Sequence, residues 1–206
     1  MCSMLLWQRR LSDSVALLRS GDWNGARIEG REVAARILGV VGLGAVGSRV
    51  TSLAQAFGMK VLVAKYGRLR TGAYQLLPLE QLAEIVDFLL IAVPRRSETE
   101  GLISENVLSR MQSSSVLINV SRGGVVDEEA LLHTLNRGGL AGAWIDVFKD
   151  EPVAAGHPLV NHPRVRATPH IAGSTKESLA RAARIAGEDM RLVFQHKRPL
   201  HALNLA

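Results

Sequence analysis

The sequence predicts an α/β fold in which helices cover both faces of a doubly wound parallel sheet. Short apolar runs alternate with stretches of helical periodicity along most of the 206 residues, a pattern typical of parallel strands joined by crossover helices. The runs are continuous rather than alternating in polarity, which indicates strands buried on both faces. In addition, the glycine-rich segment GLGAVG, residues 42–47, lies between a strand-like run and a helix-like stretch.

Each element follows from its own local signal. Strands are predicted over 36–41, 60–64, 87–93, 115–120, 140–147 and 164–169. Helices are predicted over 45–57, 79–86, 104–111, 127–137 and 176–195, where apolar residues recur at helical spacing. Residues 5–20 are interpreted as one amphipathic helix that ends near Gly21, and the turn-forming residues after it predict a loop.

The glycine loop predicts a Rossmann-type dinucleotide-binding domain, because each glycine has a mechanical purpose there. Gly42 permits a tight turn, Gly44 lets the backbone approach a pyrophosphate, and Gly47 lets helix and strand pack closely. The N-terminus of the following helix offers N–H groups and a partial positive charge to phosphates. The alternative is an ordinary strand-to-helix turn; the correct flanks on both sides favour the dinucleotide loop.

Composition narrows the class of protein. With 47% hydrophobic residues, the chain can bury a sizeable core. Cys2 is the only cysteine, which excludes an intramolecular disulfide framework and a cysteine-rich metal site and fits a reducing cytoplasm. No stretch approaches the length of a membrane span, and no metal is predicted. The formal net charge is +6, but the lysines and arginines are scattered along the chain and form no basic run. This distribution favours a solvated basic surface over nucleic-acid binding.

Chemically active side chains follow successive predicted strands: Arg122, Asp146, Glu151 and His170. An arginine above a cofactor crevice can bind a carboxylate through two parallel hydrogen bonds. Taken singly, Arg122 also fits a surface ion pair and His170 a structural histidine, while Asp146 fits a turn cap and Glu151 a solvated acid. Because the carboxyl ends of parallel strands meet at one edge of a sheet, their joint occurrence favours a shared site.

Five segments carry a resemblance to a known family: GLGAVG, INVSRGGVVDEEAL, AGAWIDVFKDEP, HPL and TPHIAGST. In order and spacing they resemble the signature segments of the D-isomer-specific 2-hydroxyacid dehydrogenases, from about Leu5 to the end of the chain. The resemblance implies an oxidoreductase that transfers a hydride between NAD(P)H and a small 2-oxo or 2-hydroxy acid. Glyoxylate, hydroxypyruvate and phosphohydroxypyruvate are substrates of this kind.

The same resemblance implies a role for each site residue. Arg122 would bind the carboxylate of the 2-oxo acid, and His170 would give a proton to its carbonyl oxygen. Glu151 would pair with His170 and favour its charged form, and Asp146 would hydrogen-bond the nicotinamide carboxamide. The remaining implied cofactor contacts are Ala45 and Val46 at the pyrophosphate, Val120, Ser121, Ala172 and Gly173 at the nicotinamide, and also Val93 and Pro94.

The second predicted strand departs from the usual NAD pattern. A domain that selects NAD places an acidic residue about twenty residues past the glycines, where it holds the ribose hydroxyls. This chain has Lys65 there, with Arg68 and Arg70 close behind, and such a basic trio would attract the 2′-phosphate of NADP(H). Arg95 and Arg96 are interpreted as bordering the same adenosine end. The alternative is a solvated basic loop; we favour NADP(H), with NAD(H) possible.

The resemblance also implies a departure at the start of the chain, which we expect to begin inside the helix that follows the family's substrate domain. We therefore expect a linker helix over 1–22, a dinucleotide-binding domain over 23–175, and a helix and tail over 176–206 that would return towards the substrate domain. In the family, the substrate domain forms the other side of the active-site cleft. Without it, we expect weak or absent activity for this chain alone. The alternative function is a catalytically weak or inactive nucleotide-binding interaction module, similar to the family's corepressors. The resemblance further implies a homodimer.

Overall fold

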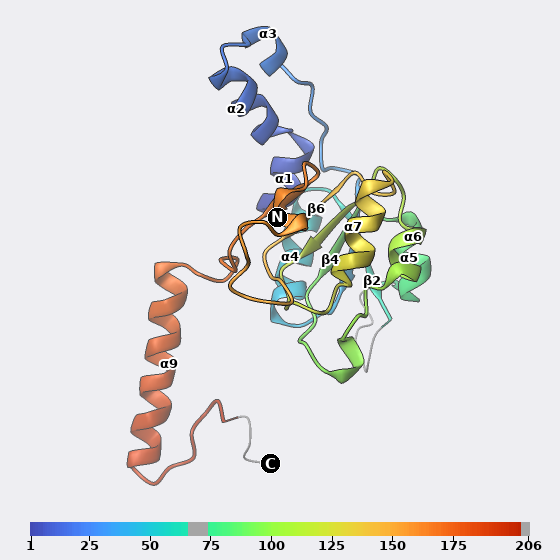
Figure 1. The fold of residues 1–206 in the computed structure, drawn as a ribbon. Helices are drawn as coiled ribbons and strands as arrows, with labels where there is room; N and C mark the ends of the chain where they lie inside the picture. The colour runs from blue at the N-terminus through green and yellow to red at the C-terminus, as the bar shows by residue number, and fades with distance from the viewer. Residues whose placement is uncertain (66–73, 203–206) are drawn as a thin grey trace. The chain divides into compact units, whose positions relative to one another are not determined.

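A computed structural model describes residues 1–65 and 74–202 of the chain (Figure 1). It divides into two compact units, Met1–Pro169 and His170–Ala206.

The first unit is built on a parallel sheet, and the predicted α/β fold class is confirmed. Within the described ranges the sheet has seven strands in the order β3-β2-β1-β4-β5-β6-β7. Every strand pairs in parallel with its neighbours. The strands are β1 Ile37–Val41, β2 Lys60–Ala64, β3 Leu76–Leu77, β4 Phe88–Ile91, β5 Val116–Asn119, β6 Gly142–Ile145 and β7 Val165–Ala167. The chain moves outward in opposite directions from β1 and β4, so the switch point lies between these two strands.

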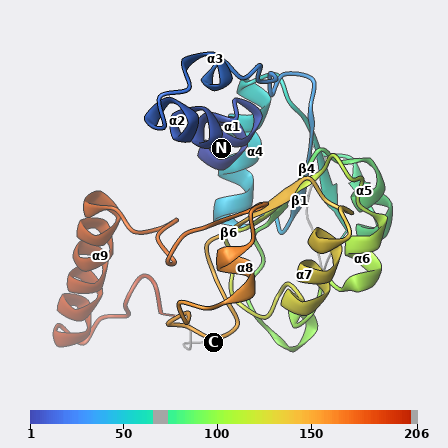
Figure 2. The same cartoon turned by 45° about the horizontal axis from the view of Figure 1, so that its top comes forward.

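Helices cover both faces of this sheet, which explains the continuous apolar runs of the strands. The helices that follow strands are α4 Ala45–Ala56, α5 Leu79–Ile85, α6 Glu105–Arg110, α7 Glu128–Asn136 and the short α8 Pro158–Asn161. Figure 2 shows α5, α6 and α7 on one face, with α4 and α1 on the other. Alternate residues of β4 enter the two cores: Leu89 and Ile91 join the α5–α7 side, and Phe88 and Leu90 join the α4 side.

The N-terminal segment differs from its prediction, because the single helix expected over residues 5–20 is two helices. These are α1, Cys2–Gln8, and α2, Leu11–Arg19, followed by the short α3, Trp23–Ala26. Arg10 between α1 and α2 adopts the left-handed conformation, with φ of 49°, and this interrupts the helix. α1 buries Met4 against the α4 side of the sheet, whereas Leu11, Val15 and Leu18 of α2 are exposed.

Asp87 fixes the starts of the two central strands. Its carboxylate accepts hydrogen bonds from the Ile37 backbone N–H at 2.7 Å and from Arg36 Nη1 at 3.1 Å.

We expect Asp87→Ala to lower the free energy of unfolding by about 1–3 kcal/mol, because the Ile37 N–H loses its partner at a half-buried position. Glu84→Ala is the control, since the Glu84 side chain pairs with the exposed Arg110 and its loss should lower the free energy of unfolding by less than about 1 kcal/mol. Urea unfolding of both variants checks this, and equal losses would contradict it.

The second unit contains one long helix, α9, over Lys176–Phe194, which confirms the helix predicted at 176–195. A reciprocal cap begins it: Thr175 Oγ1 accepts from Ser178 N at 3.0 Å, and Ser178 Oγ accepts from Thr175 N at 2.9 Å. Asp189 of α9 accepts from the backbone N–H of Leu200 at 2.9 Å, which fastens the tail to the helix. Among the helices of the described residues, none combines the length and the apolar character needed to cross a membrane.

Candidate cofactor and substrate site

The candidate site lies at the carboxyl edge of the sheet in the first unit. The candidate residues of this unit lie mainly on the loops that leave this edge after β1, β4, β5 and β6. These loops comprise residues 42–44, 92–104, 120–127 and 146–157. In open α/β sheets, ligands bind in the crevice outside this edge at the switch point.

The glycine loop after β1 has two glycines that the backbone requires and one that faces open space. Gly42 has a φ of 99°, and a Cβ atom there would lie 2.7 Å from the carbonyl oxygen of Ala92. A Cβ on Gly47 would overlap the carbonyl oxygen of Gly42, so only glycine lets α4 begin this close to β1. At Gly44, the N-cap of α4, the described residues place no atom within 4 Å of a Cβ position. That opening is the space a pyrophosphate would need beside the first N–H groups of the helix.

A cavity of about 500 Å³ opens beside this loop. It brings together six predicted site residues, Val46, Val93, Pro94, Val120, Ser121 and Arg122. Arg95 also lines it. The cavity therefore joins the start of α4 to the loops after β4 and β5.

The loop that carries Arg122 is anchored at the end of β5 by a residue that sequence reasoning missed. Asn119 is buried, and its Oδ1 accepts from Ser121 N at 3.1 Å and from Ser121 Oγ at 2.7 Å. Arg122 Nη1 donates to the carbonyl oxygen of Ser121 at 2.7 Å. The sequence signal for Asn119 is that a turn-forming amide residue ends an apolar run.

The glycine pair after Arg122 explains how this loop fits between its two neighbours. A Cβ on Gly123 would overlap the carbonyl group of Phe148 in the loop after β6. A Cβ on Gly124, whose φ is 80°, would lie 2.7 Å from Glu100 Oε1 in the loop after β4. Each glycine thus permits a close approach on a different side.

The loop after β6 holds the two predicted carboxylates in different environments. Asp146 is 2% exposed, and its Oδ1 accepts from Thr168 Oγ1 at 2.6 Å. Glu151 is exposed, and its Oε1 accepts from the backbone N–H of Phe148 at 2.9 Å. Buried polar groups in proteins are normally hydrogen-bonded, and the hydroxyl of Thr168 provides such a partner for Asp146. This hydrogen bond orients the Asp146 carboxylate at the strand end.

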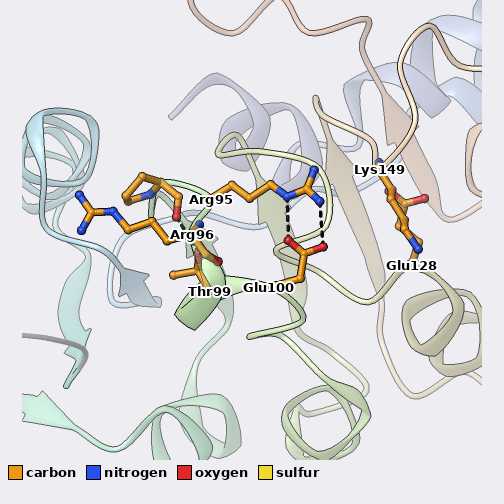
Figure 3. Close-up of polar contacts among 7 residues, drawn as sticks. Arg95, Arg96, Thr99, Glu100, Glu128 and Lys149 are labelled. Carbon is orange, nitrogen blue, oxygen red and sulfur yellow. Dashed lines mark hydrogen bonds and ion pairs between the residues drawn. The ribbon is translucent and has the colours of Figure 1, made fainter.

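Neighbouring residues brace this loop. The backbone N–H of Lys149 donates to Glu128 Oε1 at 2.6 Å, and Figure 3 shows these two residues side by side. The other oxygen of Glu128 lies 3.4 Å from His157 Nε2, and the His157 ring packs edge-on against Phe148 with 5.3 Å between centroids. His157 belongs to the HPL segment, so that segment supports the loop that bears Glu151.

The basic residues predicted at the adenosine end belong to two segments of the sequence, one after β2 and one after β4. Lys65 is exposed just after β2, and its backbone N–H donates to the carbonyl oxygen of Leu77 at 2.7 Å. Arg68 and Arg70 lie outside the described residues. Arg95 and Arg96 point in opposite directions from the loop after β4 (Figure 3). Arg95 lines the cavity that contains Arg122, so it does not share the position of Arg96.

The remaining predicted residues, His170, Ala172 and Gly173, begin the second unit. His170 adopts the left-handed conformation with φ of 53°, which few residues other than glycine do. The carbonyl oxygen of Gly173 accepts from Ser178 Oγ at 2.6 Å, which ties this segment to the first turn of α9. In the described part of the chain, no cluster of three or more His, Cys, Asp or Glu residues is suited to a metal ion.

Comparison with known proteins assigns the class. Residues 1–172 match the model of the D-isomer specific 2-hydroxyacid dehydrogenase, NAD binding domain, and the chain belongs to this family. The "Glyoxylate reductase" of Korarchaeum cryptofilum is 36% identical over 192 residues, which are 88% of this chain and 57% of that protein. The "D-3-phosphoglycerate dehydrogenase" of Bacillus subtilis is 34% identical over 201 residues, 96% of this chain and 38% of that protein.

Solved structures show the same likeness. The NADPH-dependent glyoxylate/hydroxypyruvate reductase of Sinorhizobium meliloti, solved with NADP and malonate, matches with a TM-score of 0.88 and 30% identity. The match covers 98% of this chain and 64% of that one. A protein of Thermus thermophilus matches with a TM-score of 0.88 and 33% identity, over 97% of this chain and 65% of that one. The chain therefore spans between a third and two thirds of the length of these relatives.

Proposed function

We propose that this chain is the dinucleotide-binding part of an NAD(P)-dependent oxidoreductase acting on a small 2-oxo or 2-hydroxy acid. The observation that carries the proposal is the cavity in which the glycine-loop helix, Pro94 and Arg122 converge. The open cradle at Gly44 fits a pyrophosphate, and the buried carboxylate of Asp146 fits a polar partner at the strand end. The names of the relatives support glyoxylate, hydroxypyruvate or phosphohydroxypyruvate as the acid.

The residues of the chain have distinct parts in this proposal. When bound, a nicotinamide dinucleotide would supply or accept the hydride. Arg122 binds the acid's carboxylate and draws electron density from the adjacent carbonyl group. Asp146 would orient the nicotinamide carboxamide, and His170 would provide the proton for the carbonyl oxygen. The family resemblance assigns Glu151 as the partner of His170. The unusual backbone conformation of His170 supports a role beyond packing, because strained conformations concentrate at functional positions.

The alternative of an inactive interaction module has less support, because the relatives are named as reductases and dehydrogenases. The division into a linker helix, a nucleotide domain and a returning helix remains a prediction, as do the homodimer and the cytoplasmic location.

We further propose that NADP(H) is preferred over NAD(H). Lys65 stands where NAD-selective domains carry an acid, and Arg68 and Arg70 follow it in the sequence. The S. meliloti structure contains NADP, which supports this choice.

Titration with NADPH and NADH, followed by nicotinamide fluorescence, tests both proposals. We expect tighter binding of NADPH, and we expect Lys65→Glu to lower NADPH affinity by about tenfold while NADH affinity is kept, a loss of about 1.4 kcal/mol. Lys60→Glu is the matched control, because Lys60 is an exposed lysine at the opposite end of the same strand. A Lys65→Glu variant with an unchanged affinity ratio would refute the cofactor preference.

Glyoxylate and hydroxypyruvate are then added to the NADPH complex. Loss of NADPH absorbance supports a working reductase, and binding without turnover supports a cofactor-binding part that needs further chain. Failure to bind either dinucleotide would overturn the proposed function.

A further inference from the structure

Arg95 and Glu100 form an ion pair to which the proposed reaction gives no role. Arg95 Nε lies 2.7 Å from Glu100 Oε2 and Arg95 Nη2 lies 3.0 Å from Glu100 Oε1, so the two side chains meet fork to fork (Figure 3). Such bidentate pairs add geometric specificity to the electrostatic attraction. Arg95 lines the cavity that contains Arg122, and Glu100 lines a second cavity together with Gly124.

The short turn between the two residues brings them face to face. The turn is the 3₁₀ helix Ser97–Thr99, and the buried Thr99 organises it. Thr99 Oγ1 donates to the carbonyl oxygen of Pro94 at 2.8 Å and accepts from Arg96 N at 2.7 Å. The ion pair is therefore set up by the backbone of its own loop before any ligand binds.

The pair is seated on the loop that carries Arg122. Arg95 Cζ would lie 3.3 Å from a Cβ on Gly124, and Glu100 Oε1 would lie closer still. Just behind the pair, Gly101 N donates to the carbonyl oxygen of Gly124 at 2.8 Å, and Ile103 N donates to that of Val125 at 3.0 Å. On its other side the same loop abuts Phe148 through Gly123. The position of Arg122 thus depends on contacts from both neighbours.

We propose that Arg95 and Glu100 are positioning residues, whose ion pair holds the Gly123–Gly124 backbone so that Arg122 meets the carboxylate of the acid. This inference rests on the proposed function of Arg122. Because the pair is about half exposed, at 49% for Arg95 and 44% for Glu100, it adds little to global stability. Its expected effect is to fix the conformation of the 120–127 loop, which carries Arg122.

The test compares Glu100→Gln, Arg95→Met and the double variant in the full chain. Calorimetry gives the affinity of the NADP⁺-bound chain for oxalate, a two-carbon probe of the carboxylate site, and fluorescence gives the affinity for NADPH. We expect each single variant to bind oxalate about tenfold more weakly, because a positioned group that is displaced by about 1 Å can lose up to about a hundredfold of its effect. The double variant should bind no worse than the singles, since one pair is lost in all three.

Glu84→Gln is the matched control, because it breaks an ion pair with Arg110 of equal length, 2.7 Å, and similar exposure, 45% and 47%. It should change neither affinity. Loss of NADPH affinity in step with oxalate affinity would indicate general destabilisation and overturn the proposal, as would unchanged oxalate affinity.

Hydrogen exchange separates this inference from the proposed function. Exchange of the Gly101 and Ile103 amides in the unliganded chain should accelerate in Glu100→Gln and not in Glu84→Gln. If the parent chain binds no oxalate, the proposed role of Arg122 fails, and the amide exchange alone decides whether the pair holds the loop. Unchanged exchange would then refute it.

Discussion

Arg122→Lys is expected to lower kcat/KM for glyoxylate by about a hundredfold, the size associated with removing one preorganised donor from a reacting group. Lysine keeps the positive charge but loses the planar fork that binds both carboxylate oxygens. The loop itself should keep its shape, because it is anchored through Asn119 and Ser121 rather than through the guanidinium alone. NADPH affinity should therefore change little, since the glycine loop provides the phosphate contacts in this proposal.

Steady-state kinetics and an NADPH titration of the same preparation measure both quantities. Arg137→Lys serves as the control, because Arg137 is an exposed arginine at the C-cap of α7. A parent-like kcat/KM in Arg122→Lys would remove Arg122 from the substrate site. A joint loss of kcat/KM and NADPH affinity would instead assign Arg122 to the cofactor.

The sheet was predictable from the sequence because its strands are buried on both faces. In β4, four consecutive apolar residues serve two cores, and no polar residue interrupts the run. Two other elements left weaker signals. β3 has only two residues, Leu76 and Leu77, which is shorter than any pattern can specify. The break between α1 and α2 depends on the left-handed conformation of Arg10, while the apolar spacing continues across it.

The candidate site was predictable only in part, for a related reason. Arg122, Asp146 and Glu151 could be singled out as candidates because polar residues after apolar strands stand out in a sequence. The residues that hold them do not stand out. Thr168 reaches Asp146 from another strand end, and Glu100 reaches Gly124 across a loop boundary. Such contacts depend on the spacing of segments in the folded chain, which no local pattern records.

Two substitutions in the glycine loop distinguish its contribution to stability from its contribution to NADPH binding. Gly47→Ala should lower the free energy of unfolding by about 2–4 kcal/mol, because its methyl group would overlap the carbonyl oxygen of Gly42 and push α4 away from β1. Gly44→Ala should change that free energy by less than about 1 kcal/mol, since its methyl group meets open space and its φ of −80° suits alanine. Both variants should bind NADPH at least about tenfold more weakly, a loss of about 1.4 kcal/mol or more.

The reasons for weaker binding differ between the two variants. In Gly47→Ala the helix N-terminus is displaced from the phosphates, and in Gly44→Ala the new methyl group occupies the space through which the pyrophosphate approaches the backbone. Gly156→Ala is the control, because Gly156 also faces open space but lies in the loop after β6. Urea unfolding and NADPH titration give the two quantities. If Gly44→Ala folds and binds NADPH like the parent, the open space at Gly44 does not receive a pyrophosphate, and the dinucleotide must be sought elsewhere on the sheet edge.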